Sequence, residues 1–192
     1  MEKINAAAEA AMKEVPFASE TIYDGKILHV ERWKVHTPTG AEAFREVVLH
    51  KGAAAVIPLF EDGTTVLVRQ HRVTIDRVTY EIPAGKLDTA DEDPRDCAVR
   101  ELREETGLTA EKITFLTSLF TTPGFCSEKI GIYLAEGLSQ GDCDPDPDEV
   151  LRLVRLPLSE AVGMVMRGEI RDSKTVCGLL MAWELRKPEA AK

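Results

Sequence analysis

Apolar and polar residues alternate along much of the first fifty positions, with the period of a half-buried β-strand. Glu20–Thr37 alternates around Asp24-Gly25, a dipeptide typical of hairpin turns, and Glu42–His50 continues the alternation. Residues 2–14 are rich in good helix formers. The pattern predicts an N-terminal helix or arm followed by a small antiparallel sheet.

A second block begins after Lys51-Gly52. Ala53–Phe60 is a continuous apolar run, which predicts a strand buried on both faces. The Asp62-Gly63 turn signal predicts a hairpin between this strand and Thr64–Arg69. Val78–Ile82 has the composition of a further short strand.

The second half of the chain alternates strand and helix patterns. Three strands and two helices are expected, at Ile113–Phe120, Gly131–Ala135, Val150–Leu156, Ser159–Arg167 and Ser173–Arg186. Ser139–Glu149 reads as an acidic, turn-rich loop, and Met164 and Met166 are assigned to the core. The order of elements predicts an α/β (α+β) sandwich with a mixed sheet.

A helix between the two halves carries the clearest chemistry. Asp93 is a candidate N-cap before Pro94, and Gly107 a candidate left-handed C-cap. Glu101, Glu104 and Glu105 are spaced i, i+3 and i+4, which places them on one face. Three carboxylates there repel one another unless a cation neutralises them, and hard oxygen ligands suit Mg²⁺ or Mn²⁺. The alternative is a solvated acidic face, with Arg100–Glu104 an ordinary helix pair.

The wider stretch Gly85–Leu108 resembles the Nudix box, GX5EX7REUXEEXGU, where U is aliphatic. Gly85 supplies its glycine, Glu92 its first glutamate, and Arg100–Leu108 its REUXEEXGU segment. Six residues rather than five separate Gly85 from Glu92, so we interpret one residue as inserted in the loop before the helix. That insertion leaves the helix intact and puts the path of the loop in question.

Composition narrows the possible functions. The chain has 192 residues, 44% of them hydrophobic and 30% charged, which fits a soluble globular protein with a core. Its net charge of −9 argues against electrostatic binding to nucleic acid. The four cysteines have no CxxC spacing, which is typical of thiols in a reducing cytoplasm. The N-terminus has no long apolar run, so neither a signal peptide nor a membrane span is expected.

The resemblance extends beyond the box to about residues 18–185, and is greatest to the ADP-ribose pyrophosphatase branch of Nudix hydrolases. The segments that carry it are Phe44–Val48, Leu67–Arg72, Tyr80–Lys86, Pro123–Glu128, Asp148-Glu149 and Gly168–Thr175. It implies a Nudix-type α/β/α sandwich over residues 51–192, and an N-terminal sheet within residues 1–50 that helps to form a homodimer. It also implies Mg²⁺-dependent hydrolysis of ADP-ribose to AMP and ribose 5-phosphate.

The resemblance also implies roles for particular residues. Glu101, Glu105 and the Ala84 carbonyl are expected metal ligands, and Glu104 is expected to ligate or support a second ion. Arg100 is expected to orient the carboxylates, with Glu92 as a candidate partner. Glu149 is the first candidate for the general base, with Asp148 and Glu128 as rivals. A solvated acidic turn is the alternative for Asp142–Glu149.

Candidate substrate-binding residues lie on the predicted strands and turns. Arg45, Arg69 and Arg72 are candidates to clamp a diphosphate or ribose, although surface ion pairs are the alternative. Glu81 is a candidate to reach metal or a substrate-binding arginine, with a structural ion pair as the alternative. Glu46 and Pro123 belong to the same branch segments. Phe17, Tyr23 and Trp33 are candidates to stack on adenine, with a place in the core as the default.

Rival functions share part of this pattern. The box also occurs in hydrolases of other nucleotide sugars such as GDP-mannose, of dinucleoside polyphosphates and of nucleoside triphosphates. A nucleotide-sensing Nudix domain without catalysis is a further alternative, although the three glutamates are intact. Neither GxGxxG nor GxxxxGK[ST] occurs, which excludes Rossmann dehydrogenases and P-loop ATPases at the motif level.

Overall fold

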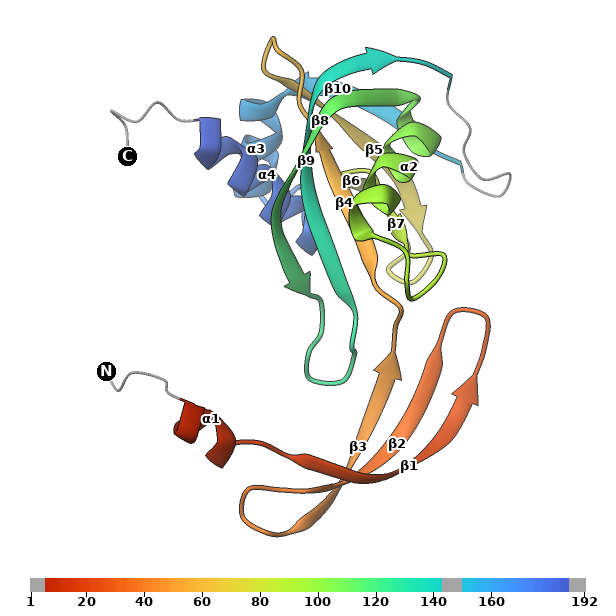
Figure 1. The fold of residues 1–192 in the computed structure, drawn as a ribbon. Coiled ribbons are helices and arrows are strands. Elements are labelled where there is room, and N and C mark those ends of the chain that lie inside the picture. The colour runs from red at the N-terminus through yellow and green to blue at the C-terminus, as the bar shows by residue number, and fades with distance from the viewer. Residues whose placement is uncertain (1–5, 143–149, 187–192) are drawn as a thin grey trace. The chain divides into compact units, whose positions relative to one another are not determined.

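A computed structural model describes residues 6–142 and 150–186. The chain forms two compact units, which Figure 1 draws as ribbons. The first lies within Met1–His50 and Thr122–Glu128, and the second within Lys51–Thr121 and Lys129–Lys192. Among the described residues, no helix is long and apolar enough to cross a membrane.

The first unit is a three-stranded antiparallel sheet preceded by a short helix. The helix α1 spans Ala6–Ala11, and the strands β1, β2 and β3 span Val15–Asp24, His29–His36 and Glu42–Leu49. The predicted helix, hairpin and third strand are confirmed, although β1 begins five residues earlier than expected.

The aromatic side chains of this unit do not form a core. Phe17 is 45% and Tyr23 58% exposed, so their default assignment to the core is wrong. Phe17 stacks on His36, with 4.2 Å between ring centroids, and Trp33 Nε1 donates to Glu31 Oε2 at 2.5 Å. A small three-stranded sheet buries little apolar surface on its own, which leaves the rings of Phe17 and Tyr23 exposed and that of Trp33 partly buried.

The second unit contains two sheets. One has the order β7-β4-β9-β8, with the strands Ala84–Lys86, Ala53–Pro58, Lys129–Gln140 and Leu108–Phe120. Its β4 and β9 are parallel and its other neighbours antiparallel, which confirms the predicted mixed sheet. The other sheet has the order β10-β5-β6, with the strands Arg152–Pro157, Thr64–Arg72 and Arg77–Glu81.

Helices cover both faces of the larger sheet, as Figure 1 shows. The helix α2 (Pro94–Thr106) packs on one face, and α3 (Leu158–Met166) and α4 (Ser173–Arg186) on the other. Ala53, Ala55 and Ile57 of β4 belong to the core under α3 and α4, and its Ala54 and Val56 to the core under α2. The continuous apolar run is therefore buried on both faces, as predicted, and the α/β/α sandwich is confirmed.

Two expectations for this unit are wrong. The Asp62-Gly63 turn forms, and Leu59, just after β4, bridges to Thr65, but β4 and β5 themselves belong to different sheets. Instead, β9 pairs with β4 along its whole length, although β9 lies some 75 residues further along the chain. Met164 is buried, but Met166 is 76% exposed, because two positions along a helix rotate a side chain by about 200°, away from the face that contains Leu158, Ala161 and Met164.

The predicted helix over the glutamate-rich segment and its two predicted caps are confirmed. Asp93 caps α2 by accepting from Arg95 N at 2.8 Å, and Pro94 is its first residue. Gly107 ends it with φ 69°, and its N–H donates to Arg103 O. Both ends satisfy main-chain groups that have no partner inside the helix, so this short element has defined limits.

Candidate active site

The short strand β7 and the residues just before it lie against the start of β4 and the C-terminal half of α2. Val56 N donates to Pro83 O at 2.9 Å, and Ala84 N donates to Glu105 Oε2 at 3.1 Å. The Glu105 side chain is buried, although it carries a carboxylate. A buried carboxylate requires charge-assisted hydrogen bonds or a cation. Glu105 therefore connects the helix to the loop at the residue whose carbonyl is a predicted metal ligand.

Gly85 makes room for a second carboxylate. A Cβ atom added to Gly85 would lie 1.9 Å from Glu101 Oε1 and 2.1 Å from Glu101 Cδ. These distances are far below any van der Waals contact, so any residue other than glycine would displace the carboxylate. The opening glycine of the box is thus required by a close approach between β7 and α2.

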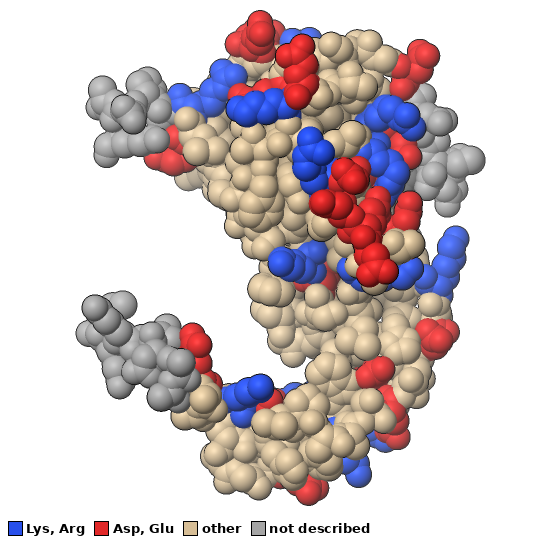
Figure 2. Space-filling model, viewed as in Figure 1, with Lys and Arg blue, Asp and Glu red and all other residues tan. Residues whose placement is uncertain are grey.

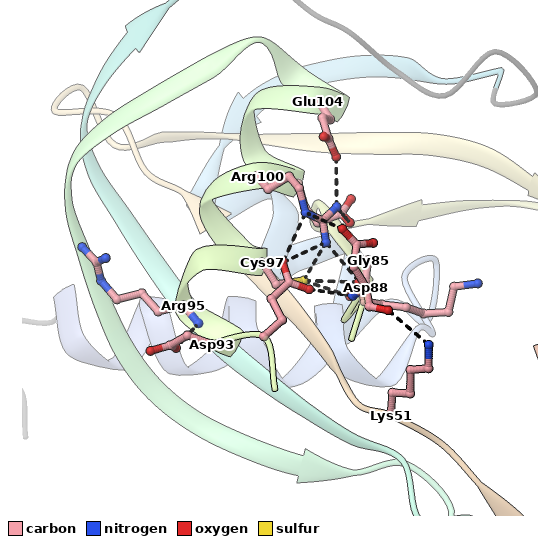
Figure 3. Close-up of polar contacts among 11 residues, drawn as sticks. Lys51, Gly85, Asp88, Asp93, Arg95, Cys97, Arg100 and Glu104 are labelled. Carbon is pink, nitrogen blue, oxygen red and sulfur yellow. Dashed lines mark hydrogen bonds and ion pairs between the residues drawn. The ribbon is translucent and has the colours of Figure 1, made fainter. Parts of the chain in front are cut away.

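Arg100 is the centre of the polar contacts in Figure 3. Its Nη1 donates to Glu101 Oε1 at 2.6 Å and to Glu104 Oε2 at 3.1 Å. Its Nε and Nη2 both donate to Glu92 Oε1 at 3.3 Å, and Nη2 donates to Lys86 O at 3.1 Å. The expected contact with Glu92 is present, and the arginine orients two of the three helix carboxylates.

The residue inserted before Glu92 is accommodated in a turn. Asp88 N donates to Glu92 Oε2 at 2.6 Å, and Glu92 N donates to Thr89 O at 3.3 Å. Lys51 Nζ donates to the Asp88 carbonyl at 3.1 Å (Figure 3). The extra residue is therefore compatible with the contact between Glu92 and Arg100.

Acidic side chains gather over α2 beside lysine and arginine side chains in Figure 2. Burial opposes the charge on Arg100, but Glu101 and Glu92 outweigh it and raise the pKa of this guanidinium. Among residues 6–142 and 150–186, no three His, Cys, Asp or Glu side chains are arranged to hold a metal ion. In the structure the Arg100 guanidinium contacts the carboxylates of Glu92, Glu101 and Glu104.

The residues present nevertheless fit a divalent cation. Three carboxylates and a main-chain carbonyl are hard oxygen donors of the kind that Mg²⁺ and Mn²⁺ prefer. The space at Gly85 admits the Glu101 carboxylate directly beside the loop that carries the Ala84 carbonyl. Because Arg100 contacts both Glu101 and Glu104, we expect a bound ion to re-orient these carboxylates around the guanidinium.

Cys97 reinforces the contact between α2 and β7. Its Sγ lies 3.6 Å from Gly85 O and 3.5 Å from Lys86 O, and its side chain is fully buried. Burial raises the pKa of this thiol to about 12. It is therefore a protonated packing residue with weak S–H donation rather than a nucleophile.

Glu81 forms a buried ion-pair network next to the loop. Arg72 Nε and Nη2 donate to its two carboxylate oxygens at 2.8 and 2.6 Å, and Thr79 Oγ1 donates at 2.6 Å. Lys174 Nζ donates to Glu81 Oε2 at 2.5 Å. Burial alone would raise the pKa of Glu81, but Arg72 and Lys174 outweigh it and lower this pKa from 4.5 to about 2. The carboxylate is ionised at neutral pH.

Replacing Glu81 by glutamine is expected to destabilise the fold by roughly 3 kcal/mol at pH 7. Folding lowers the pKa of Glu81, so its contribution is complete above about pH 4.5 and is lost as the pH falls toward 2. Urea unfolding of wild type and E81Q between pH 7 and 2.5 would measure the difference, which should shrink across that window. E160Q removes an exposed pair with Arg167 and should have a much smaller effect than E81Q at pH 7. A difference for E81Q that does not change with pH would contradict this account.

The predicted substrate-binding arginines have different surroundings. The guanidinium of Arg69 lies 5.0 Å above the ring of Tyr80, its partner across β5 and β6. Arg72 donates hydrogen bonds to Glu81 through two nitrogens. Arg45, in the first unit, pairs with Glu14 and donates through Nη1 to Phe44 O at 2.8 Å. The geometry brings Arg72 and Glu81 together as an ion pair, one of the two predicted alternatives for Glu81.

A cavity in the first unit gathers two of the predicted residues. It has a volume of about 560 Å³ and is lined by Arg32, Phe44, Arg45, Glu46, Gly124 and Phe125. Both aromatic rings are more than half exposed, and Arg32 lies 5.4 Å from the Phe44 ring centroid. Guanidinium groups and exposed rings are the groups that bind phosphate, ribose and a flat base.

The remaining predicted residues are in loops. Pro123 lies in the exposed turn between β8 and β9. Glu128 Oε1 is 3.6 Å from His50 Nε2, which identifies a partner for this rival base. Glu149 and Asp148 lie outside the described residues, so their roles stay predictions.

Sequence reasoning missed the contribution of the first turn of α4. Lys174 and Thr175 belong to the Gly168–Thr175 segment, to which no role was assigned. A lysine and a threonine in an otherwise apolar helix, at positions where the core begins, were the available signal. Their partners are 93 residues away, so no local pattern identifies them.

Comparisons with known proteins identify a family, similar sequences and a similar solved structure. The NUDIX domain family profile matches residues 49–178. A Bacillus subtilis (strain 168) protein described as ADP-ribose pyrophosphatase is 38% identical over 86% of this chain and 90% of its own. A methanol dehydrogenase activator from Bacillus methanolicus is 40% identical over 85% and 89%. A solved ADP compounds hydrolase superposes with a TM-score of 0.80 at 25% identity, covering 90% of this chain and 94% of its own.

Proposed function

Since this chain belongs to the NUDIX domain family, we propose that it hydrolyses the diphosphate of ADP-ribose to AMP and ribose 5-phosphate. The observation that carries the proposal is the set of three glutamates on α2, held against β7 through Gly85 and Ala84. The ADP-ribose pyrophosphatase of Bacillus subtilis, similar over most of this chain, supports the choice of substrate.

The proposed cofactor is Mg²⁺, with Mn²⁺ as a substitute. Glu101, Glu105 and the Ala84 carbonyl would hold it, and Glu104 would ligate or support a second ion. A divalent cation there supplies positive charge to the phosphoryl oxygens and makes water more acidic.

The protein's own groups supply orientation and proton transfer. Arg100 holds Glu101 and Glu104 through Nη1, so it acts on the carboxylates rather than on the substrate. Glu149 is the proposed general base that takes the proton from the attacking water. A carboxylate suits this role because it is ionised at neutral pH without further perturbation.

Substrate binding is proposed for both units. Arg69 and Arg72 would attract the diphosphate, with Glu81 orienting Arg72 through two hydrogen bonds. Within the first unit, Arg45 and Glu46, with Phe44 and Phe125, line a cavity that is proposed to accept a nucleoside. Pro123 lies next to that cavity's Gly124 in sequence and is proposed to shape the turn.

The proposed assembly is a homodimer in which residues 1–50 form the interface and residues 51–192 the hydrolase domain. Exposed apolar side chains of the first unit support this arrangement, namely Phe17, Ile22, Tyr23, Ile27, Leu28 and Phe44. Sedimentation velocity should give the mass of two chains. A cytoplasmic location is also proposed, supported by the free thiols of Cys97, Cys126 and Cys177.

A substrate panel tests the activity. Wild-type protein with Mg²⁺ or Mn²⁺ is given ADP-ribose, ADP-glucose, GDP-mannose, diadenosine polyphosphates and deoxynucleoside triphosphates, and phosphate is released by a coupled phosphatase. We expect kcat/KM for ADP-ribose to exceed each of the others by about tenfold or more. AMP and ribose 5-phosphate should be the products.

Two other outcomes would overturn parts of the proposal. A preference for GDP-mannose or a triphosphate would retain the diphosphate chemistry and discard the substrate. Tight nucleotide binding without any hydrolysis would instead favour a sensor domain.

A further inference from the structure

The first turn of α4 contains a buried cation that the proposed mechanism does not use. Lys174 is 8% exposed, and lysine is rarely buried unless it is paired. Its Nζ donates to Glu81 Oε2 at 2.5 Å and lies 3.1 Å from Asp172 Oδ2. These two carboxylates hold the ammonium group in one place, and the ammonium group in turn holds Glu81, four residues before Gly85.

Thr175, the next residue, holds the main chain at the same point. Its Oγ1 accepts from Ile82 N at 2.9 Å and donates to Asp172 Oδ2 at 2.6 Å. Thr175 and Ile82 are both buried, so water does not replace this hydrogen bond. A hydroxyl is needed here because it donates and accepts at once.

The segment from Ile82 to Ala84 is consequently held from two sides. The first turn of α4 fixes Ile82 N–H, while Pro83 O accepts from Val56 N at 2.9 Å and Ala84 N donates to Glu105 at 3.1 Å. Pro83 has a restricted φ, so few main-chain dihedrals remain between these hydrogen bonds. The direction of the Ala84 carbonyl therefore depends on α4 as well as on α2.

We propose that Thr175 and Lys174 are positioning residues that set the direction of the Ala84 carbonyl from the first turn of α4. The inference rests on the proposed function in one respect, the assignment of that carbonyl as a metal ligand. Neither residue touches the substrate in this proposal. Lys174 acts through Glu81, and Thr175 acts through Ile82. Groups that orient a metal ligand typically affect metal affinity by about 10- to 100-fold.

The principal test compares T175V with T175S. Valine keeps the shape of threonine but removes the acceptor of Ile82 N–H, whereas serine retains a hydroxyl. In metal-free protein, we expect hydrogen exchange at Ile82 and Ala84 to be about tenfold faster in T175V and near wild type in T175S. Electron paramagnetic resonance with Mn²⁺ alone should show about tenfold weaker binding in T175V.

Steady-state kinetics separates positioning from general destabilisation. With ADP-ribose as substrate, T175V should need about tenfold more Mg²⁺ for half-maximal rate, whereas its KM for ADP-ribose at saturating Mg²⁺ should stay within about twofold of wild type. A purely structural role would lower the folded fraction and kcat together, without changing the Mg²⁺ requirement. T175S should restore the wild-type Mg²⁺ requirement.

The variant K174M provides a second test, because it leaves the Thr175 hydroxyl in place. It should raise the Mg²⁺ requirement and the exchange rate at Ile82 in the same direction, by about threefold or more. K112M is its matched control, since Lys112 forms an exposed pair with Glu136 on β8 and β9 and should change neither quantity. If T175V does not fold, the comparison of K174M with K112M decides the question.

The outcomes distinguish this inference from the proposed function. Unchanged Mg²⁺ requirement, Mn²⁺ binding and exchange in the folded variants would overturn the positioning role while leaving hydrolysis intact. If wild-type protein hydrolyses no diphosphate, the proposed function fails, and the exchange and Mn²⁺ measurements still decide the role of α4.

Discussion

Replacing Glu105 by glutamine is expected to lower kcat for ADP-ribose on the order of a thousandfold, or about 4 kcal/mol of activation free energy. Glutamine retains an oxygen that can accept from Ala84 N, so the contact between α2 and the loop can persist. It lacks the negative charge that holds a divalent cation. The loss should therefore appear in kcat and in the Mg²⁺ requirement, with the melting temperature changed by only a few degrees.

D96N is the matched control for E105Q. It neutralises another carboxylate of α2, but Asp96 is exposed and pairs loosely with Arg95 at 3.7 Å. Its kcat should remain within about twofold of wild type. Equal losses in E105Q and D96N would indicate a general effect of helix charge, and full activity in E105Q would remove Glu105 from the metal site.

Replacing Gly85 by alanine is expected to lower kcat/KM by about 10²-fold or more with little change in stability. The new Cβ would lie 1.9 Å from Glu101 Oε1, and a side-chain end can rotate away where a backbone could not. The fold can therefore adapt, but only by moving the carboxylate away from β7 and from the contact with Arg100. Activity measured over a range of Mg²⁺ concentrations, together with thermal unfolding, would separate the two effects.

G163A tests whether any glycine substitution has this effect. Gly163 lies within α3, and an added Cβ would approach Arg167 Nη1 at 3.0 Å, the end of a flexible, half-exposed side chain. It should leave activity unchanged and increase stability slightly, since alanine favours a helix more than glycine. A large loss of stability in G85A would show that the close approach is structural instead.

Much of the fold could be predicted because its signals are local. The caps at Asp93 and Gly107 define α2, and the apolar run of β4 predicts burial on both faces. The pairing of β4 could not be predicted, because a turn signal reports a chain reversal and says nothing about which strand takes the neighbouring edge. The strand that pairs with β4 begins near Ile130, far along the chain.

The site shows the same division between local and distant information. The spacing of the glutamates and of Arg100 is contained in one helix, so their common face follows from helix geometry. The two cations that bind Glu81 could not be predicted in this way, because Arg72 and Lys174 come from two other elements of the fold. Met166 is a local error, since it lies two positions from the buried Met164 and therefore on the opposite side of α3.

Arg100 gives the acidic helix a counter-ion of its own. The proposed metal ion would then compete with Arg100 for Glu101 and Glu104, and its affinity would be the difference between two attractions. A nucleotide diphosphate adds further oxygen ligands for the ion and so shifts that difference in its favour. By thermodynamic reciprocity, the ion strengthens nucleotide binding by the same factor. The arginine would thus couple the occupancy of the site by the ion to its occupancy by the substrate, so that the concentration of either would affect the apparent affinity for the other.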